Sequence, residues 1–388
     1  MKVLLVTPPY HCGVVESAGR WLPLGLLYLA EAVRRAGHEV EVYDAMTLFH
    51  APEEVEAHIA ARAPEVVAVT MVTPTAVAAV EVLAGAKRRL PGVITVAGGV
   101  HATFMAKDLL LATGSPVDYC VIGEGEATLP DLLACLAAGA DPARVRGVAC
   151  RQDGAVAYGP PRAVTPDLEA VAPAWDLVNW NDYTYFPFPG SRLAIVSSSR
   201  GCSFACSFCS QTKFWDRGWR GRRPEAVADE LEMLRDRHGV DVVLFSDEYP
   251  TPDRDRWTRL MDLALERKLG MKFLMETRVE DIVRDADLLP RWREAGVIHV
   301  YVGVESTEQG TLDRFNKHLR VEQSREALAL LNAAGMVSET SFVLGMPEDT
   351  PETIRNTLAL AHDYAPDFAH FLLIAPWPYA ELYPQLKP

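Results

Sequence analysis

Residues 199–209 read Ser-Arg-Gly-Cys-Ser-Phe-Ala-Cys-Ser-Phe-Cys and hold three cysteines in the spacing C-x3-C-x2-C. A structural zinc site uses four ligands, and this stretch supplies only three. An iron–sulfur cluster held by three thiolates keeps one iron open to a small molecule. We therefore interpret Cys202, Cys206 and Cys209 as the ligands of a [4Fe–4S] cluster at a catalytic site. A zinc knuckle that lacks one ligand, or chance spacing, is the alternative.

The composition is that of a globular protein with two domains. The chain has 388 residues, of which 49% are hydrophobic and 23% charged, and one ordinary core does not extend over such a length. The first residues lead into Pro8 and Pro9, which indicates a first strand rather than a signal peptide. No apolar run reaches the length of a membrane span, so we expect a cytoplasmic protein without one.

The net charge and the cysteines limit which ligands and which cellular compartment the sequence favours. The net charge of −14 argues against nucleic acid, whose binding requires a basic face. We interpret the one basic cluster, Arg217–Arg223, as a solvated loop in preference to an anion site. The seven cysteines have no disulfide-like spacing, which fits a reducing compartment. The four outside the triad are scattered and predict no further metal site.

Residues 1–139 alternate strands and helices. We predict strands at Lys2–Thr7, Glu39–Asp44, Val66–Met71, Val93–Ala97 and Tyr119–Ile122. The predicted helices are Arg20–Ala36, Pro52–Arg62, Ala76–Arg89, Lys107–Ala112 and Leu129–Ala138. Such alternation produces a parallel sheet with helices on both faces. We therefore predict a doubly wound, Rossmann-like α/β domain.

Ligands on doubly wound sheets bind beyond the carboxyl ends of the strands. Four loops are expected there, at Thr7–Tyr10, Thr70–Thr73, Gly98–His101 and Gly123–Glu126. Glycine at two of these strand ends lets a ligand approach the backbone closely. No G-x-G-x-x-G follows the first strand, so the sequence does not support a dinucleotide.

Residues 140–190 have a different character. The stretch Arg146–Tyr158 predicts a hairpin that turns at Asp153-Gly154. Five prolines between Pro160 and Pro187 and a group of aromatic residues follow it. We interpret this segment as a hairpin and linker. Its aromatic residues then pack at an interface rather than stack on substrate.

Residues 191–388 resume the alternation. The predicted strands are Leu193–Ser197, Val240–Phe245, Lys272–Met275, His299–Val302, Thr340–Leu344 and Ala369–Ile374. The predicted helices are Pro224–Arg237, Asp253–Arg267, Leu288–Ala295, Val321–Ala334 and Pro351–Tyr364. Six such units predict a partial (β/α)6 barrel, with catalytic residues at the carboxyl ends of its strands. The sixth unit lacks a closing helix, so we expect a barrel that is truncated at the C-terminus.

Polar residues follow several barrel strands. Asp247 and Glu248 come after the second strand and can accept hydrogen bonds from an ammonium group, or can cap the next helix. Arg278 ends the third, where its fork suits a carboxylate, or forms a surface ion pair. Glu305 ends the fourth and can hold a ribose diol or an ammonium. Gly345 follows the fifth, where backbone groups could meet an adenine.

The cysteine triad after the first barrel strand resembles the hallmark of the radical S-adenosylmethionine (SAM) superfamily. The resemblance implies that the open iron chelates the amine and carboxylate of SAM. Reductive cleavage then gives a 5′-deoxyadenosyl radical, which abstracts hydrogen from a small-molecule substrate. A reductant such as flavodoxin or ferredoxin is implied as a partner. The implied SAM-binding residues are Phe208, Asp247, Glu248, Arg278, Glu305 and Gly345.

The N-terminal domain is similar to the cobalamin-binding domain of the B12-dependent branch of this superfamily. The Gly98–His101 and Gly123–Glu126 segments are typical of it. The branch's D-x-H-x-x-G motif, which gives cobalt a lower histidine, is absent, and His11 in Tyr10-His11-Cys12-Gly13 lacks the aspartate. Because the branch often omits this ligand, cobalamin is still implied. The implied cobalamin-binding residues are Thr70, Thr73, Gly98, Gly99, His101, Gly123 and Glu124.

Residues 206–215, 312–317 and 376–378 are similar to the anaerobic magnesium-protoporphyrin monomethyl ester oxidative cyclases, which continue further than this chain. Relatives of those enzymes methylate unactivated carbons with methylcobalamin. Two enzyme hypotheses therefore stay open, a cyclase-like oxidation and a radical methyl transfer. A third is a non-catalytic cobalamin or iron–sulfur sensor. The paired carboxylates argue against it, because a sensor needs no bound SAM.

Overall fold

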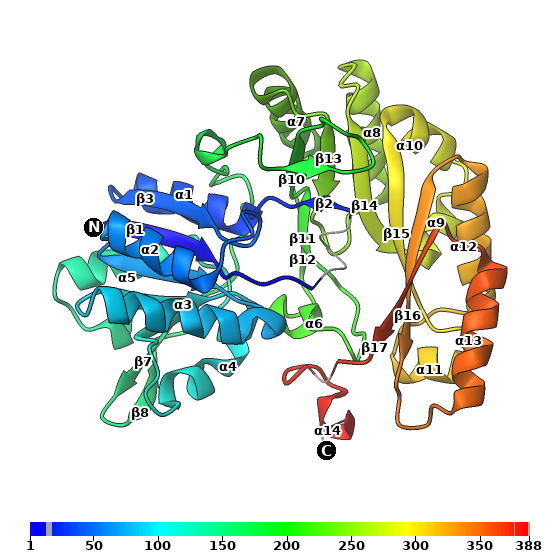
Figure 1. Ribbon diagram of the computed structural model, residues 1–388. Coiled ribbons are helices and arrows are strands. Elements are labelled where there is room, and N and C mark those ends of the chain that lie inside the picture. Colours follow the sequence, from blue (N-terminus) through cyan, green and yellow to red (C-terminus); the bar gives the residue numbers. More distant parts are fainter. Residues whose placement is uncertain (13–17, 376, 387–388) are drawn as a thin grey trace. The chain divides into compact units, whose positions relative to one another are not determined.

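The computed structural model describes residues 1–12, 18–375 and 377–386. The chain folds into two compact units, Met1–Pro189 and Gly190–Pro388 (Figure 1). Gly13 and Pro376, which belong to two of the sequence matches above, lie outside the described residues. None of the described helices is both long and apolar enough to cross a membrane.

The N-terminal unit is built on a seven-stranded sheet. Its strands are β1 (Lys2–Thr7), β3 (Glu39–Asp44), β4 (Val66–Thr70), β5 (Ile94–Gly98), β6 (Tyr119–Val121), β7 (Val148–Gln152) and β8 (Ala155–Tyr158). They lie in the order β3-β1-β4-β5-β6-β7-β8, and the first five are parallel. Numbered along the chain, the parallel strands have the 2-1-3-4-5 order of flavodoxin-like doubly wound folds. The predicted α/β fold of this unit is confirmed.

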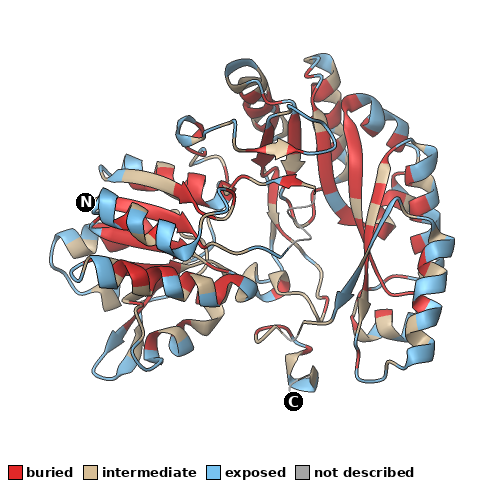
Figure 2. Ribbon diagram, in the orientation of Figure 1, coloured by how far each residue is buried: buried red, intermediate tan, exposed pale blue. Residues whose placement is uncertain are grey.

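Helices cover both faces of this sheet (Figure 1). They are α1 (Leu24–Arg35), α2 (Pro52–Arg62), α3 (Ala76–Arg89), α4 (Val100–Leu111) and α5 (Thr128–Ala137). Leu4 and Val6 of β1 pack on one face with side chains of α2, α3 and α4, while Val3 and Leu5 pack on the other with α1 and α5. A central strand such as β1 is therefore buried from both sides, and Figure 2 shows the inner strands of this sheet in red.

Two helices begin elsewhere than the sequence predicts. α1 starts at Leu24, after Pro23, because Gly19–Arg20 form the short strand β2, which pairs with β9 (Thr184–Tyr185). α4 starts two turns before the predicted Lys107, directly after Gly99. Gly99 has a φ of 92°, and a Cβ there would lie 2.6 Å from the Met71 carbonyl oxygen. Glycine therefore permits the sharp turn from β5 into α4.

The predicted hairpin is present as β7 and β8. Asp153 and Gly154 at its turn both have positive φ, as a two-residue hairpin turn of this kind requires. β7 pairs antiparallel with β6, so the hairpin extends the N-terminal sheet. The chain then runs through the short helix η4 (Trp175–Leu177), where the rings of Trp175 and Trp180 lie 5.9 Å apart.

The C-terminal unit is built on six parallel strands in chain order. They are β10 (Leu193–Val196), β13 (Val242–Phe245), β14 (Lys272–Arg278), β15 (Val297–Glu305), β16 (Val337–Leu344) and β17 (Phe368–Leu373). The helices are α6 (Gln211–Phe214), α7 (Pro224–His238), α8 (Arg254–Glu266), α9 (Val279–Arg284), α10 (Leu289–Ala295), α11 (Gln309–Arg314), α12 (Val321–Ala333), α13 (Pro351–Tyr364) and α14 (Tyr383–Leu386). The predicted partial (β/α)6 barrel is confirmed.

The core of this unit lies between the sheet and its helices. Trp257 of α8 and Trp292 of α10 are fully buried and pack edge to face, with 6.1 Å between ring centroids. Phe245 and Phe273 of neighbouring strands contact the same cluster. β17 differs from the other strands, because five of its six residues are exposed (Figure 2).

Candidate active site in the C-terminal unit

The cysteine stretch forms a loop at the carboxyl end of β10. It connects β11 (Ser199–Gly201) to β12 (Trp219–Gly221), which pair antiparallel. Gly201 has a φ of 91°, and a Cβ there would lie 2.1 Å from the Gly218 carbonyl oxygen, so the base of the loop requires glycine. Cys206 is buried, and Cys202 and Cys209 are partly exposed.

Hydrogen-bond donors point at the sulfur atoms of the triad. The Gln211 N–H donates to Cys209 Sγ over 3.4 Å, and Arg278 Nη1 donates to Cys206 Sγ over 3.7 Å. Such donors tune thiolates that are bound to iron. Burial raises the pKa of Cys209 to about 11 and also raises the pKa of Cys202. Binding of a cluster must therefore displace protons from these two thiols.

The arrangement fits a cluster better than a single metal ion. Among the described residues, no three His, Cys, Asp or Glu side chains converge as the ligands of one ion do. The irons of a [4Fe–4S] cluster each take one thiolate, so its cysteines stand further apart than the ligands of one ion. Three cysteines on one loop, with donors to sulfur, fit such a cluster. They do not form a closed zinc site.

A segment that follows α11 holds the cysteine loop in place. Ser207 donates from its N–H to the Phe315 carbonyl and from its hydroxyl to the Arg314 carbonyl, both over 2.9 Å. Asn316 Nδ2 donates to the Ala205 carbonyl over 2.8 Å. The rings of Phe208 and Phe315 lie 4.8 Å apart, so Phe208 anchors the loop to this segment. The stretch 312–317 noted in the sequence is thus a structural support for the triad.

Arg278 lies against the cysteine loop rather than on the surface. It is 6% exposed, and its Cζ lies 3.5 Å from the centroid of the Phe204 ring. Its Nη2 donates to Glu280 Oε1 over 2.5 Å and also to the Lys317 carbonyl. Arg278 thus does form an ion pair, with Glu280, but at a buried position rather than on the surface. Arg278 instead brings a fixed positive charge to the loop that carries the thiols.

Asp247 and Glu248 have different surroundings. Asp247 is fully buried, and its carboxylate accepts hydrogen bonds from the Ser198 N–H and from the Ser198 and Ser199 hydroxyls, over 2.5 to 2.7 Å. Glu248 is partly exposed and accepts from the Gly201 N–H and from Trp215 Nε1. Burial raises the pKa of both carboxyls. Asp247 therefore supports the loop from beneath, and Glu248 lies nearer to its surface.

The helix cap that the alternative interpretation gave to Asp247 and Glu248 is formed by another residue. Asp253 accepts a hydrogen bond from the Arg256 N–H over 3.0 Å and caps α8.

The basic cluster, Arg217–Arg223, also differs in part from the solvated loop that we predicted. Arg222 forms an ion pair of 2.6 Å with Glu230, and both side chains are at most 10% exposed.

Glu305 ends β15 in a strained backbone conformation. Its φ is 65°, and the register of β15 against β16 shifts between Val302 and Glu305. The carboxylate accepts hydrogen bonds from Lys317 Nζ over 2.8 Å and from the Ser341 hydroxyl over 3.1 Å. A Cβ at Gly303 would lie 2.6 Å from both charged groups, so glycine leaves room for this buried pair.

Gly345 follows β16 with a φ of 88°. Its N–H donates to Asp349 Oδ2 over 2.7 Å, and the Met346 N–H donates to the same oxygen. Glu348, in the same turn, forms an ion pair with Arg314. The N–H groups of this turn are thus used within the loop.

Two charged residues near this site could not be singled out from the sequence. Lys317, whose side chain is 7% exposed, lies within a surface-type polar stretch of the sequence. Glu276 lies two residues before Arg278 on β14, so it points to the same face of the sheet, into the open interior of the partial barrel. Partial desolvation inside the barrel and the charges of Glu248, Asp247 and Glu305 raise the pKa of Glu276 to about 7.

In the N-terminal unit, the predicted cobalamin-binding residues lie at one edge of the sheet, where hydrogen bonds connect neighbouring loops. Thr70 and Gly98 are register partners at the ends of β4 and β5, next to the point where the strand order reverses. The Thr73 hydroxyl and His101 Nδ1 lie 3.0 Å apart, and the His101 N–H donates to the Met71 carbonyl. Burial lowers the pKa of His101, which favours its neutral form.

The loop after β6 continues this edge. The Gly123 N–H donates over 2.9 Å to the Thr103 hydroxyl, which donates over 2.9 Å to the Gly99 carbonyl. Glu124 accepts a hydrogen bond from the Thr165 N–H over 2.7 Å. The structure thus brings the seven predicted residues onto three neighbouring strand ends. Thr103, which links two of them, was missed because a lone helical threonine gives no sequence signal.

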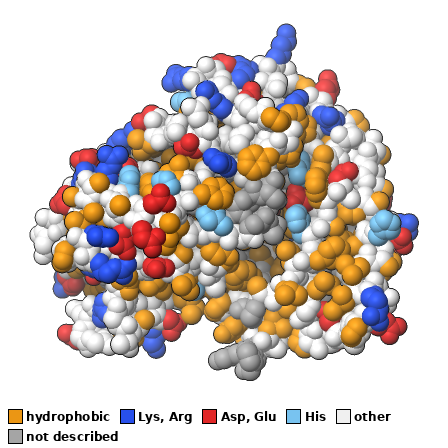
Figure 3. Space-filling view, viewed as in Figure 1, with side chains coloured by type: hydrophobic (Ala, Val, Ile, Leu, Met, Phe, Trp, Pro, Cys, Tyr) orange, Lys and Arg blue, Asp and Glu red, His pale blue; other side chains and the backbone are white. Residues whose placement is uncertain are grey.

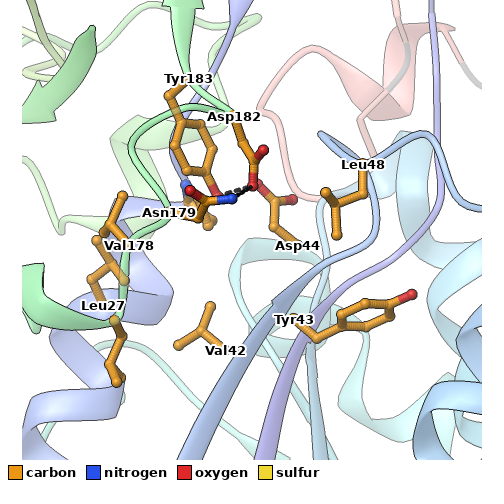
Figure 4. A pocket seen from close by; sticks show the side chains of 11 residues that line it. Leu27, Val42, Tyr43, Asp44, Leu48, Val178, Asn179, Asp182 and Tyr183 are labelled. Carbon is orange, nitrogen blue, oxygen red and sulfur yellow. Dashed lines mark hydrogen bonds between the residues drawn. The ribbon is translucent and has the colours of Figure 1, made fainter.

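The N-terminal unit has further features at the ends of β1 and β3. His11 stacks on Phe49, with 4.3 Å between ring centroids. A pocket at the carboxyl end of β3 is lined in part by Leu27, Leu48 and Tyr183 (Figure 4). Within it the Tyr183 hydroxyl donates to Asp44 over 3.0 Å, and Thr7 donates to the same carboxylate. Asp44 thereby ties the segment after η4 to the sheet.

Comparison with known proteins identifies the family. Residues 10–133 match the B12 binding domain and residues 196–361 match the Radical SAM superfamily. The chain is 38% identical over 391 residues to the anaerobic magnesium-protoporphyrin IX monomethyl ester cyclase of Rubrivivax gelatinosus, covering 100% of this chain and 70% of that protein. The chain belongs to the B12-binding radical SAM enzymes. The resemblance drawn from the cysteine triad is confirmed.

This B12-binding radical SAM enzyme also resembles methyltransferases. It is 30% identical over 322 residues to the hopanoid C-3 methylase of Methylococcus capsulatus, covering 83% of this chain and 60% of that protein. Its fold matches a radical SAM methyltransferase from Kitasatospora setae, solved with a tryptophan substrate and a SAM analogue, with a TM-score of 0.80 at 20% identity. That match covers 100% of this chain and 76% of the other. The cofactors of the family are a [4Fe–4S] cluster, SAM and cobalamin, and the sensor hypothesis is set aside because the family consists of enzymes.

Proposed function

We propose that this chain carries out a cyclase-like oxidation of a magnesium tetrapyrrole. The observation that supports this is the 38% identity to a magnesium-protoporphyrin IX monomethyl ester cyclase along the whole chain. Because the chain spans 70% of that relative, the activity of the complete relative is carried over as a proposal. When bound, the cluster and SAM supply a 5′-deoxyadenosyl radical, and the chain's own residues bind, orient and shield the reactants.

We assign the cluster to Cys202, Cys206 and Cys209. The donors at Cys206 and Cys209 and the positive charge of Arg278 support the assignment, because they offset the negative charge of the bound thiolates. Phe208 is proposed to shield the site from one side, since its ring packs on Phe315 directly beside the triad. Exclusion of water would protect a reactive radical from side reactions.

We assign the binding of SAM to residues around the triad. Glu248, partly exposed beside Gly201, is proposed to accept hydrogen bonds from the ammonium group, with fully buried Asp247 as a positioning residue. Glu305 is proposed to face the ribose, held by Lys317. Gly345 is proposed to meet the adenine through its carbonyl, because its N–H is already bonded to Asp349.

We assign cobalamin to the edge formed by Thr70, Thr73, Gly98, Gly99, His101, Gly123 and Glu124. Support comes from the strand order, because ligands of such sheets bind at the carboxyl ends beside the switch point. The positive φ of Gly99 and Gly123 permits close backbone approach there. No histidine is assigned to cobalt, because His11 is stacked on Phe49 and lacks the motif.

Radical methyl transfer is the second candidate function. It is supported by the 30% identity to a hopanoid methylase over most of the chain. In that case methyl transfer to the substrate would consume a second SAM and release S-adenosylhomocysteine. In either case we propose a low-potential reductant such as flavodoxin or ferredoxin, no nucleic acid partner and a cytoplasmic location. The absence of disulfide-like spacing among the cysteines in the sequence supports a reducing compartment.

The test is anaerobic turnover of the reconstituted protein with SAM, reductant and magnesium-protoporphyrin IX monomethyl ester. The proposal expects 5′-deoxyadenosine and an oxidised tetrapyrrole, without S-adenosylhomocysteine. Cys206→Ala should abolish both products, whereas Cys135→Ala, on α5 of the N-terminal unit, should retain them. S-adenosylhomocysteine in step with a methylated product would instead establish the methyltransferase.

A further inference from the structure

A cluster of two histidines and a carboxylate lies on the last three strands of the C-terminal sheet, outside the site described above. His299 of β15, Glu339 of β16 and His370 of β17 form it. Glu339 Oε2 lies 2.7 Å from His299 Nε2, and Glu339 Oε1 is hydrogen-bonded to His370 Nε2. One carboxylate thus orients two imidazoles on the neighbouring strands.

The cluster faces the interior of the partial barrel. Tyr301 is the register partner of both Glu276 and Glu339. Burial raises the pKa of the Tyr301 hydroxyl, and the nearby charges of Glu305, Glu276 and Glu339 raise it further. His299 lies two residues before Tyr301, on the same face of β15. His370 is the register partner of Ser341, whose hydroxyl bonds Glu305. Arg278 pairs with Gly303 at one side of the sheet and Ser341 pairs with His370 at the other, so polar positions on this face extend as far as β17.

The contact with Glu339 fixes which nitrogen of His370 carries the proton, because Glu339 Oε1 is hydrogen-bonded to His370 Nε2. An ionised carboxylate only accepts hydrogen bonds, so His370 Nε2 carries its proton toward Glu339. In the neutral ring Nδ1 then keeps a lone pair, and it has no hydrogen-bond partner among the described residues.

Exposed apolar side chains flank His370 on the same face of β17. Phe368 is 54% exposed and Leu372 is 43% exposed. Each lies two residues from His370 on β17, so their side chains point to the same face as that of His370. Phe368 also lies against the His299 ring, with 6.1 Å between centroids. Hydrophobic side chains gather on the viewed face of this unit (Figure 3). A flat, largely apolar ligand with one atom that accepts a nitrogen lone pair would match this surface.

We propose that His370 Nδ1 is the axial ligand of the metal ion in a metallated tetrapyrrole substrate, with Glu339 as the residue that positions the imidazole. The inference rests on the proposed function, which supplies a magnesium tetrapyrrole. Magnesium held by four ring nitrogens keeps an axial position open, and a neutral imidazole is a common metal ligand. Histidines that bind metals almost always donate their other N–H to a carboxylate or carbonyl, as His370 does. Phe368 and Leu372 would contact the apolar face of the macrocycle.

The test is a double-mutant-type cycle. Magnesium is removed from the tetrapyrrole and the imidazole of His370 is removed by substitution, first separately and then together. Magnesium-protoporphyrin IX monomethyl ester and its metal-free form are titrated into anaerobically reconstituted protein and followed by tetrapyrrole absorbance. In the wild type, removal of magnesium should weaken binding about 10- to 100-fold. His370→Ala should weaken binding of the magnesium form by the same factor and leave binding of the metal-free form unchanged.

The remaining variants separate ligation from a structural role. Glu339→Gln should weaken only the magnesium form, by up to about 10-fold, because it disturbs the orientation of the ligand. His362→Ala, an exposed histidine on α13, should bind both forms like the wild type. Equal losses for both tetrapyrroles in His370→Ala, or no loss for either, would overturn the inference alone. A wild type that binds neither tetrapyrrole would overturn the proposed cyclase function and this inference with it.

Discussion

The two sides of the C-terminal sheet differ in how completely their polar side chains are bonded. Beside β10 and β14, Asp247, Arg278 and the Glu305–Lys317 pair are buried and hydrogen-bonded to one another or to the loops that they hold. At β17, most residues are exposed and His370 keeps an unused nitrogen. We propose that the first side is pre-organised for the cofactors, which are the same in every turnover, and that the second leaves surface and a nitrogen lone pair for a substrate.

The largest effect is expected where the pre-organised side holds the cluster. Cys202→Ala or Cys209→Ala removes one of three thiolates, and two cannot hold the cluster in its loop. We expect cluster iron and 5′-deoxyadenosine formation to be lost, measured by iron analysis and by chromatography of the reaction mixture. Cys150→Ala is the matched control. A Cys209→Ala protein with full iron content would contradict the assignment.

The next effect concerns the buried ion pair. Lys317→Met leaves the Glu305 carboxylate buried without its charged partner, which should cost about 3–5 kcal/mol of unfolding free energy. Replacing both residues, as Glu305→Leu with Lys317→Met, should recover much of this loss. Denaturant unfolding of the three proteins measures it. A single variant as stable as the wild type would mean that the pair is not desolvated.

A smaller and pH-dependent effect is expected for Glu276. Its pKa is raised from 4.5 to about 7 in the folded protein, so the folded state favours the protonated form. The resulting stabilisation is complete below about pH 4.5 and is lost as the pH rises to about 7. Because the side chain reaches solvent, we expect Glu276→Gln to stabilise the protein at pH 8 by only about 1 kcal/mol. Unfolding at pH 5 and pH 8 checks this, and an equal effect at both would refute the raised pKa.

The smallest effect should come from the exposed side. Leu373 is 79% exposed on β17, so Leu373→Ser should change the unfolding free energy by no more than about 0.5 kcal/mol. Unfolding of Leu373→Ser under the conditions used for the Lys317 variants allows the two changes in unfolding free energy to be compared directly. A loss of several kcal/mol would show that this side of the sheet is buried in the folded protein.

The same contrast explains what the sequence could predict. The strands and helices have strong local patterns, so the fold could be predicted, and the triad lies in one short stretch, so cluster ligands could be proposed. The partners that complete the site are far apart in the chain. Lys317 meets Glu305 across the turn and helix that follow β15, and His299, Glu339 and His370 meet only through the pairing of three strands. Nothing local distinguishes such residues from ordinary polar side chains. The burial of Asp247 beneath Glu248 depends in the same way on the loop packed above it.

Electron paramagnetic resonance of the reduced, reconstituted protein tests the central claim most directly. Three thiolates should hold one [4Fe–4S] cluster whose open iron binds SAM. The account predicts a signal for a reduced [4Fe–4S] cluster that changes on addition of SAM, with about four irons per chain by the cluster's formula. A reconstituted chain that binds zinc instead of iron, or a cluster signal that SAM leaves unchanged, would contradict it.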